Sequence, residues 1–160
     1  MLALQLVHSE ILTHAFVLQA ALSGQIADKN LDSSQKFSLG GPNGVMGYAV
    51  GDGGGDDGYL ADLELSHRVP LRSMPGALHA GVLAQYGMIH VNHQDYLRYG
   101  SRNHLTEAAF GTRFTYAWRG WQVTASYGWR IGSHDRSGAA SASGGEFWAS
   151  IGKSFEGLGD

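Results

Sequence analysis

GGPNGVMGY, residues 40–48, is the most informative stretch of this sequence. It belongs to a segment without strand-like alternation that continues through the glycine-rich run from Gly51 to Gly58. A loop this long is uncommon in a compact domain and is usually functional. The segments around it alternate between apolar and polar residues, and each is long enough to cross a bilayer as a tilted strand. This combination favours a membrane β-barrel with a functional loop over an enzyme pocket.

The composition also fits a barrel. Charged residues make up 16% of the chain, below the value of about 25% that is typical of soluble domains. The net charge of −3 comes without a basic block, so nucleic-acid binding has no support. The absence of cysteine excludes disulfides, zinc–cysteine sites and thiol catalysis. No run of about 18 apolar residues occurs, so no transmembrane helix is expected.

Alternation with a period of two residues predicts about six strands, with residues 28–58 as a long loop after the first. The predicted strands cover residues 13–25, 59–69, 77–91, 106–118, 121–131 and 146–155. Six strands cannot close a wide barrel, and open sheet edges are not tolerated in lipid. We therefore predict an all-β fold, the antiparallel transmembrane part of a larger barrel, with a long glycine-rich loop.

The beginning of the chain does not resemble an export signal. Residues 1–12 lack a positive start, and His8, Ser9 and Glu10 interrupt the apolar run. An outer-membrane protein needs such a signal, so we expect residues 1–160 to be the C-terminal part of one barrel domain in a longer protein.

The polar faces of the predicted strands carry charged residues that suit a wet lumen better than the interface of a soluble β-sandwich. The sandwich remains the alternative fold. The predicted lumen charges are Asp62, Glu64, Glu107, Arg113 and Arg130.

Residues 30–48, NLDSSQKFSLGGPNGVMGY, together with GDDGYL at 55–60, resemble the two-partner secretion transporters of Gram-negative outer membranes. This family contains the haemolysin secretion/activation proteins and the adhesin exporters. The resemblance covers nearly the whole chain. It implies a barrel that exports a large unfolded exoprotein across the bacterial outer membrane, without enzymatic activity, cofactor or metal. The implied partners are the exoprotein, outer-membrane lipid and the barrel-assembly machinery.

The resemblance also implies that the glycine-rich loop folds inward, into the lumen of the barrel, and that the tip of the loop forms a lock with the barrel wall. A Val-Arg-Gly-Tyr motif at the tip corresponds to Val45, Met46, Gly47 and Tyr48, after the loop glycines Gly40, Gly41 and Gly44. A Phe-x-Asp-x-Gly motif on the wall corresponds to Leu83, Gln85 and Gly87. In the family, the tip arginine is expected to pair with the wall aspartate.

This sequence replaces both members of that pair, with Met46 for the arginine and Gln85 for the aspartate. Loss of one member of a buried pair leaves an uncompensated charge and costs about 3–5 kcal/mol. Loss of both avoids that cost, so we predict a contact between Met46 and Gln85. Two unrelated substitutions remain the alternative.

Other motifs support weaker hypotheses. Asp52, Asp56 and Asp57 lack the ligand spacing of a calcium loop, and His90, His93, Asp95 and His104 are better explained as loop residues than as a metal site. A small autonomous or oligomeric outer-membrane protein with a structural or adhesive role is the alternative function. A hydrolase at the barrel rim, using His93 or Asp95, is the third.

Overall fold

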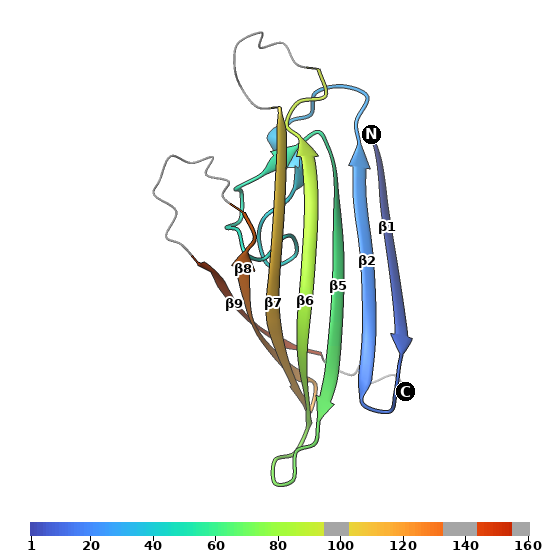
Figure 1. Ribbon diagram of the computed structural model, residues 1–160, viewed down its shortest axis with the longest axis vertical. Helices are drawn as coiled ribbons and strands as arrows, with labels where there is room; N and C mark the ends of the chain where they lie inside the picture. Colours follow the sequence, from blue (N-terminus) through green and yellow to red (C-terminus); the bar gives the residue numbers. More distant parts are fainter. Residues whose placement is uncertain (95–102, 133–143, 155–160) are drawn as a thin grey trace, which may run out of the picture.

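The computed structural model describes residues 1–94, 103–132 and 144–154. They form one antiparallel sheet of seven long strands in the order β1-β2-β5-β6-β7-β8-β9 (Figure 1). The strands are β1 (Leu2–Ile11), β2 (Phe16–Ile26), β5 (Asp57–Val69), β6 (Ala77–His90), β7 (His104–Trp118), β8 (Trp121–Arg130) and β9 (Gly145–Lys153). Between β2 and β5 lie η1 (Ser33–Gln35), β3 (Phe37–Ser38) and β4 (Gly54–Gly55), which pairs with β3.

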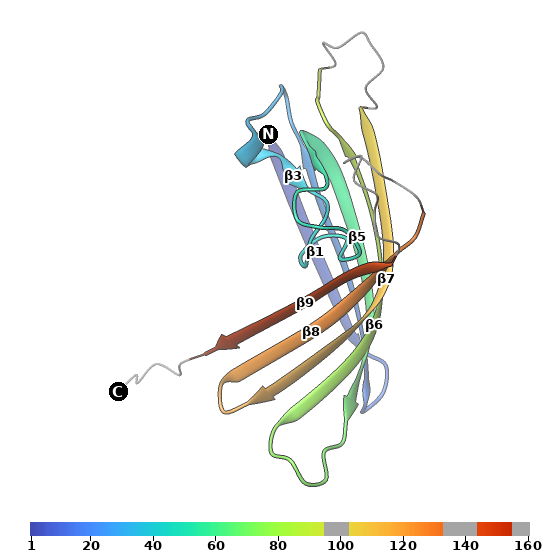
Figure 2. The same cartoon turned by 90° about the vertical axis from the view of Figure 1, so that its left-hand side faces the viewer.

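The sheet is curved, and the segment between β2 and β5 lies on its concave side (Figure 2). The connections β1–β2, β5–β6 and β7–β8 lie at one end of the strands, and the segment between β2 and β5 starts from the other end (Figure 1). The β7–β8 connection is a two-residue turn in which Arg119 and Gly120 have φ angles of 47° and 78°. Positive φ at both central residues is the geometry that matches the twist of paired strands, so this turn allows β7 and β8 to stay in register.

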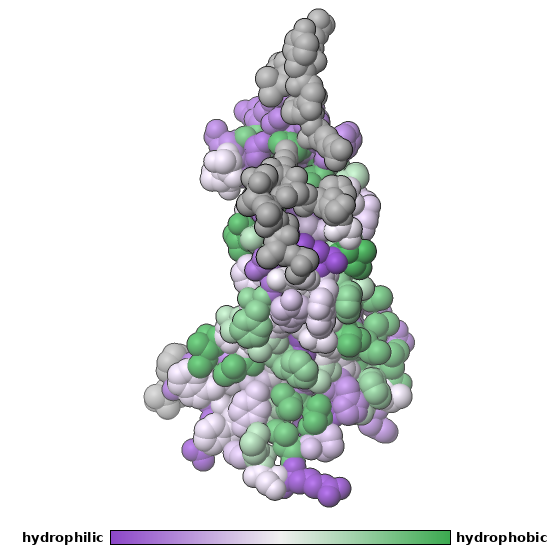
Figure 3. All heavy atoms as spheres, turned by 60° about the vertical axis from the view of Figure 1, so that its left-hand side comes forward, coloured by the Kyte–Doolittle hydropathy of each residue, from purple (hydrophilic) through white to green (hydrophobic). Residues whose placement is uncertain are grey.

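The two faces of the sheet differ in polarity. On the convex, outer face, large apolar side chains are exposed along the strands: Leu63, Val82, Tyr86, Phe110, Phe114, Val123, Phe147 and Ile151. Figure 3 shows hydrophobic side chains spread over the strand region on one side of the molecule. On the concave, inner face, the polar side chains of Gln85, Glu107 and Ser126 are buried. This distribution is that of a sheet with lipid outside and a polar lumen inside.

The predicted all-β antiparallel fold is confirmed. The strands have between 9 and 15 residues, enough to cross a bilayer, which takes about 9–11 residues in a tilted strand. Within the described residues the sheet does not close, and β1 and β9 are its edge strands. Among these residues no helix is long and apolar enough to cross a membrane.

One strand was missed. Residues 2–11 form β1, which pairs with β2 along its whole length, from Leu2 opposite Ile26 to Ile11 opposite Val17. Sequence reasoning missed β1 because the polar residues 8–10 hide the alternation that places Leu2, Leu4 and Leu6 on the outer face. The sheet therefore has seven strands instead of about six.

The bounds of the other elements differ from the prediction by a few residues. The first predicted strand, 13–25, begins at Phe16, because residues 12–15 form the turn after β1. The predicted loop 28–58 ends at Asp56, because Asp57 already pairs with His90. In the last predicted strand, residue 155 lies outside the described residues.

A charge on the outer face tests its contact with lipid. Val82 lies in the middle of β6 with 58% of its surface exposed, so Val82→Arg is expected to destabilise the folded barrel by about 2–4 kcal/mol. The measurement is urea-induced unfolding of the full-length protein in lipid vesicles. Gln122→Arg, on the inner face of β8, is the matched control. A Val82→Arg effect within about 0.5 kcal/mol, as on a water-exposed surface, would contradict the membrane orientation.

Candidate functional site

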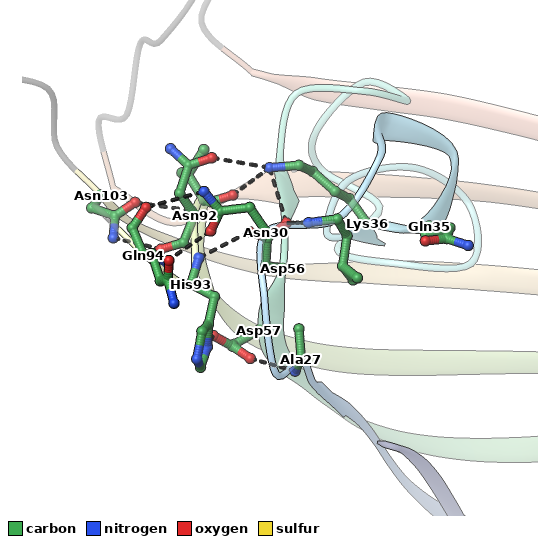
Figure 4. A network of polar contacts seen from close by, with 12 residues as sticks. Ala27, Asn30, Gln35, Lys36, Asp56, Asp57, Asn92, His93, Gln94 and Asn103 are labelled. Carbon is green, nitrogen blue, oxygen red and sulfur yellow. Dashed lines mark hydrogen bonds and ion pairs between the residues drawn. The ribbon is translucent and has the colours of Figure 1, made fainter. Parts of the chain in front are cut away.

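The candidate site is residues 27–56, referred to below as the inward loop, with the part of the inner face that it covers. The ends of this loop are fixed at one end of the sheet by polar contacts (Figure 4). The buried carboxylate of Asp56 accepts hydrogen bonds from the main-chain N–H groups of Leu31, at 3.1 Å, and His93, at 2.9 Å. Lys36 Nζ lies 3.1 Å from Asp56 Oδ1 and also donates to the carbonyl of Val91. These contacts join the loop to the residues that follow β6.

Further bonds extend this base network. The N–H of Ala27 donates to Asp57 Oδ1 at 2.6 Å, and His93 Nδ1 lies 2.8 Å from Asp57 Oδ2. Asn30 and Gln94 exchange two hydrogen bonds, at 3.1 Å and 2.7 Å. The loop is therefore anchored at its start, its middle and its end.

The environment of Asp56 favours its charged form. Burial raises the pKa of this carboxyl, but the N–H groups of His93 and Leu31 and the ammonium of Lys36 outweigh burial and lower the pKa below its ordinary value of 3.8. The pair with Lys36 is therefore intact at neutral pH.

Beyond the base, the loop folds into a compact tip. The N–H of Leu39 donates to Gly53 O at 2.9 Å, and the N–H of Val45 donates to Leu39 O at 2.7 Å. Gly41, with φ of 110°, donates to Tyr48 O at 3.0 Å. Leu39, Val45 and Tyr48 are buried in one apolar cluster with residues of the wall: Leu60, Ile89, Leu105 and Ala109. The tip therefore packs against the sheet as a folded unit.

The structure brings the predicted pair Met46 and Gln85 together. The main-chain N–H of Met46 donates to Gln85 Oε1 at 2.9 Å, and both residues are buried. Gln85 Nε2 donates in turn to Asp62 Oδ2. The contact therefore uses the main chain of Met46 and the whole amide of Gln85. An aspartate at position 85 could accept a hydrogen bond from the tip but could not donate one to Asp62, whereas Gln85 does both.

Two glycines of the wall allow the tip to approach closely. A Cβ atom on Gly87 would lie 2.3 Å from Leu39 Cδ1, and a Cβ on Gly128 would lie 2.7 Å from both Met46 C and Gly47 N. At Gly128 the close atoms belong to the main chain of the tip, so this position requires glycine. At Gly87 the close atom is the end of the Leu39 side chain, which would have to shift to admit a Cβ atom. Sequence reasoning identified Gly87 but missed Gly128.

Two further side chains reach the tip. Trp148 Nε1 donates to Met46 O at 2.8 Å, and Arg130 Nε donates to Gly47 O at 2.6 Å. The guanidinium of Arg130 also lies 4.9 Å from the centre of the Tyr48 ring. Arg130 was predicted only as a lumen charge, and Trp148 was not predicted. The signal for Trp148 was a tryptophan on the polar face of a strand.

The remaining predicted lumen charges also lie on the inner face. Arg113 forms an ion pair with Glu64 across β6, and Glu107 is buried beneath the loop with 2% of its surface exposed. Beside the tip, two recesses of about 540 and 430 Å³ share Gln19, Pro42, Asn43, Glu64 and Arg113 in their linings. The inner face next to the loop is therefore open and polar.

The histidines do not form a chemical centre within the described residues. His93 belongs to the base network, and the rings of His90 and His104 pack against each other across β6 and β7 with centroids 4.1 Å apart. Asp95 lies outside the described residues. In the described part of the chain, no three His, Cys, Asp or Glu side chains are placed to hold a metal ion.

An antiparallel sheet with an apolar outer face and a polar inner face that holds a long inward loop is typical of one class of protein, the transport barrels of the outer membrane. Within that class, the chain belongs to the family described as haemolysin secretion/activation protein ShlB/FhaC/HecB, whose family model matches residues 2–114. Members of this family are two-partner secretion translocators of Gram-negative outer membranes. The chain is accordingly a protein of the bacterial outer membrane.

Named relatives support the assignment. The heme/hemopexin transporter protein HuxB of Haemophilus influenzae is 33% identical over 108 residues, which cover 67% of this chain and 19% of HuxB. HuxB of strain 86-028NP is 39% identical over 83 residues, which cover 52% of this chain and 14% of HuxB. The chain thus matches between 14% and 19% of the length of these relatives.

A double-mutant cycle tests the coupling between tip and wall. Met46→Arg buries a charge beside a neutral amide, and Gln85→Asp places a second carboxylate against Asp62, so each change is expected to destabilise the protein. The double variant pairs the new charges and should recover most of the loss, with a coupling of about 0.5–3 kcal/mol. The measurement is the free energy of unfolding in lipid vesicles. Met46→Leu with Gln85→Asp should show no recovery, and additive effects of the charged pair would show that a side chain at position 46 does not reach position 85.

The base network makes a prediction for Asp56. Asp56→Asn leaves Lys36 without its charged partner and is expected to cost about 3–5 kcal/mol, measured by urea unfolding and by the rate of tryptic cleavage within residues 27–56. Folding lowers the pKa of Asp56 below its ordinary value of 3.8. The contribution of Asp56 to the free energy of unfolding is therefore complete above about pH 3.8, and it is lost as the pH falls through the folded-state pKa. Asp32→Asn, at an exposed position of the same loop, is the control and should change neither quantity.

Proposed function

We propose that this chain forms part of the barrel of an outer-membrane transporter that exports a large unfolded exoprotein of the haemolysin or adhesin type by two-partner secretion. Residues 1–160 belong to a single barrel domain that contains further strands. The observation that carries the proposal is the position of the inward loop. Residues 27–56 fold back over the polar face of β5 to β8 and are held there at the base and the tip.

The inner face suits the passage of an extended polypeptide. The recesses beside the tip expose hydroxyl and amide groups of Gln19, Thr115, Gln122, Thr124 and Ser150 next to the Glu64–Arg113 pair. Such a surface replaces water around peptide groups without offering a large apolar patch on which a chain would be retained. The protein therefore acts as a passive conduit, and folding of the exoprotein outside the cell supplies the driving force.

The inward loop acts as the gate of this conduit. In its observed position the tip occupies the inner face between β6 and β9. A polypeptide can pass only when the tip leaves this position. The partners are the exoprotein, lipid on the outer face and the barrel-assembly machinery. Because HuxB carries the name heme/hemopexin transporter, an exoprotein for heme–hemopexin acquisition is a candidate cargo alongside haemolysins and adhesins.

A disulfide across the gate tests the function. In the Gly47→Cys/Ala109→Cys variant, the Cβ atoms of the tip and of β7 lie about 3.0 Å apart, so a shift of about 0.8 Å gives the usual separation of about 3.8 Å. In full-length protein without other cysteines, oxidation should stop export of the exoprotein in cells, and a reductant should restore it.

The matched control is Gly24→Cys/Tyr59→Cys. It links β2 to β5 with Cβ atoms 3.7 Å apart and leaves the loop free, so export should continue under oxidation. Continued export with the tip linked to β7 would rule out the gate. If the unmodified protein exports nothing and deletion of residues 27–56 has no effect, the alternative of a structural or adhesive outer-membrane protein is favoured.

A further inference from the structure

We infer that Arg130 and Trp148 are positioning residues that hold the tip of the inward loop by its main chain, so that the seat of the tip does not depend on the side chain at position 46. This inference deepens the proposed function, because it names the side chains that keep the gate closed. It concerns the position of the tip, which can be measured without export.

Trp148 supplies the first contact. It lies on β9 opposite Ser126 of β8, which is buried on the inner face. Its indole N–H donates to Met46 O at 2.8 Å. Indole has this one donor and no acceptor, so the side chain can bind the tip only through an acceptor such as a carbonyl group. A tryptophan that points to the polar side of a barrel is therefore accounted for by the loop.

Arg130 supplies the second contact, from the end of β8. Its Nε donates to Gly47 O at 2.6 Å, and its guanidinium lies 4.9 Å from the centre of the Tyr48 ring. Nη2 lies 3.4 Å from Glu146 Oε1 and 4.0 Å from Asp52 Oδ2. The planar guanidinium has donors in fixed directions, so the wall residue Glu146 orients the group that binds the tip.

Together with Gln85, these side chains bind three main-chain groups of two successive residues, Met46 and Gly47. Gln85 accepts from the N–H of Met46, Trp148 donates to the carbonyl of Met46, and Arg130 donates to the carbonyl of Gly47. The three side chains come from β6, β9 and β8, so they approach the peptide from different directions. We call this arrangement the main-chain clamp.

The main-chain clamp explains why the tip can lack an arginine. An N–H and a carbonyl are present at position 46 whichever side chain stands there. Gly128 leaves room for the main chain, since a Cβ at this position would lie 2.7 Å from both Met46 C and Gly47 N. In this protein the arginine that fastens the gate therefore belongs to the wall and the atoms that it binds belong to the tip.

Thiol labelling of the tip and the base distinguishes positioning from general support. The tip reporter is Val45→Cys and the base reporter is Ala27→Cys, both at buried positions, in full-length protein without other cysteines in isolated outer membranes. Arg130→Lys, which keeps the charge but loses the fixed donors, should raise the maleimide labelling rate of the tip by about tenfold, and Trp148→Phe by roughly fivefold. Labelling of the base should not change, and Met46→Leu should leave the tip protected.

Matched controls separate the main-chain clamp from a general loss of charge or aromatic surface. Arg113→Lys changes an arginine that pairs with Glu64 on the wall, and Trp121→Phe changes a tryptophan beside the β7–β8 turn. Neither should affect the tip reporter. Assembly of each variant is checked by its heat-dependent shift in electrophoresis. If Arg130→Lys does not assemble, Trp148→Phe carries the test, because it removes one N–H and keeps an aromatic ring.

Three results would overturn the inference. Protection of the tip reporter in both Arg130→Lys and Trp148→Phe would show that neither side chain positions the tip. Equal exposure of the base reporter would show that they support the whole loop instead. Exposure of the tip in Met46→Leu to the same extent would show that the side chain at position 46 does the fastening. A separate outcome concerns the gate. If Arg130→Lys or Trp148→Phe exposes the tip reporter but export continues while the disulfide links the tip to β7, the main-chain clamp stands and the gate is excluded.

Discussion

The peptide group between Met46 and Gly47 is the point at which the inward loop meets the barrel wall. The carbonyl of this group, which belongs to Met46, accepts a hydrogen bond from Trp148, and the N–H of Met46 in the preceding peptide group donates to Gln85. The space for this meeting exists because Gly128 has no side chain. Burial of a peptide away from water is tolerated only when its polar groups are paired. Polar residues on three strands of the wall pair the N–H and the carbonyl of Met46 and the carbonyl of Gly47, and the path of the loop between them follows from these contacts.

The loop tip shows how a neutral contact can replace a charged one. A buried ion pair has to offset the cost of removing both charges from water. Here Gln85 bridges the tip and Asp62 with its two amide ends, so no charge of the tip is buried at position 46. The charge that does reach the tip comes from Arg130, which is also near Glu146 and Asp52. The fastening of the tip is therefore distributed over the wall instead of concentrated in one pair.

The base and the tip of the loop are held by different kinds of contact. At the base, the buried carboxylate of Asp56 gathers two main-chain donors and Lys36. At the tip, single hydrogen bonds act beside a small apolar cluster. Contacts that involve a buried charge are costlier to break. On the proposal that the loop is a gate, this difference favours movement of the tip while the base stays attached to the residues that follow β6.

The alternation of residues along the chain was sufficient to predict six of the seven strands, the inner-face positions of Asp62, Glu64, Gln85, Glu107 and Arg113, and the long loop after the first predicted strand, whereas the inward direction of that loop came from the resemblance to the transporter family. Successive side chains of a strand point to opposite faces of the sheet. The polarity of neighbouring residues therefore indicates which face each side chain occupies. It failed for β1, where polar residues at 8–10 interrupt the pattern although the strand is paired throughout. The resemblance to the transporter family added the proximity of Met46 and Gln85, residues 39 positions apart.

The main-chain clamp and the base network could be identified only from the tertiary structure. Trp148 binds Met46 across 102 positions, and Asp56 binds His93 across 37. No periodicity encodes such pairs, because they depend on the path of an irregular loop through the lumen. That path is decided by where the wall offers glycine and hydrogen-bond donors, which is a property of several strands together and of no single segment.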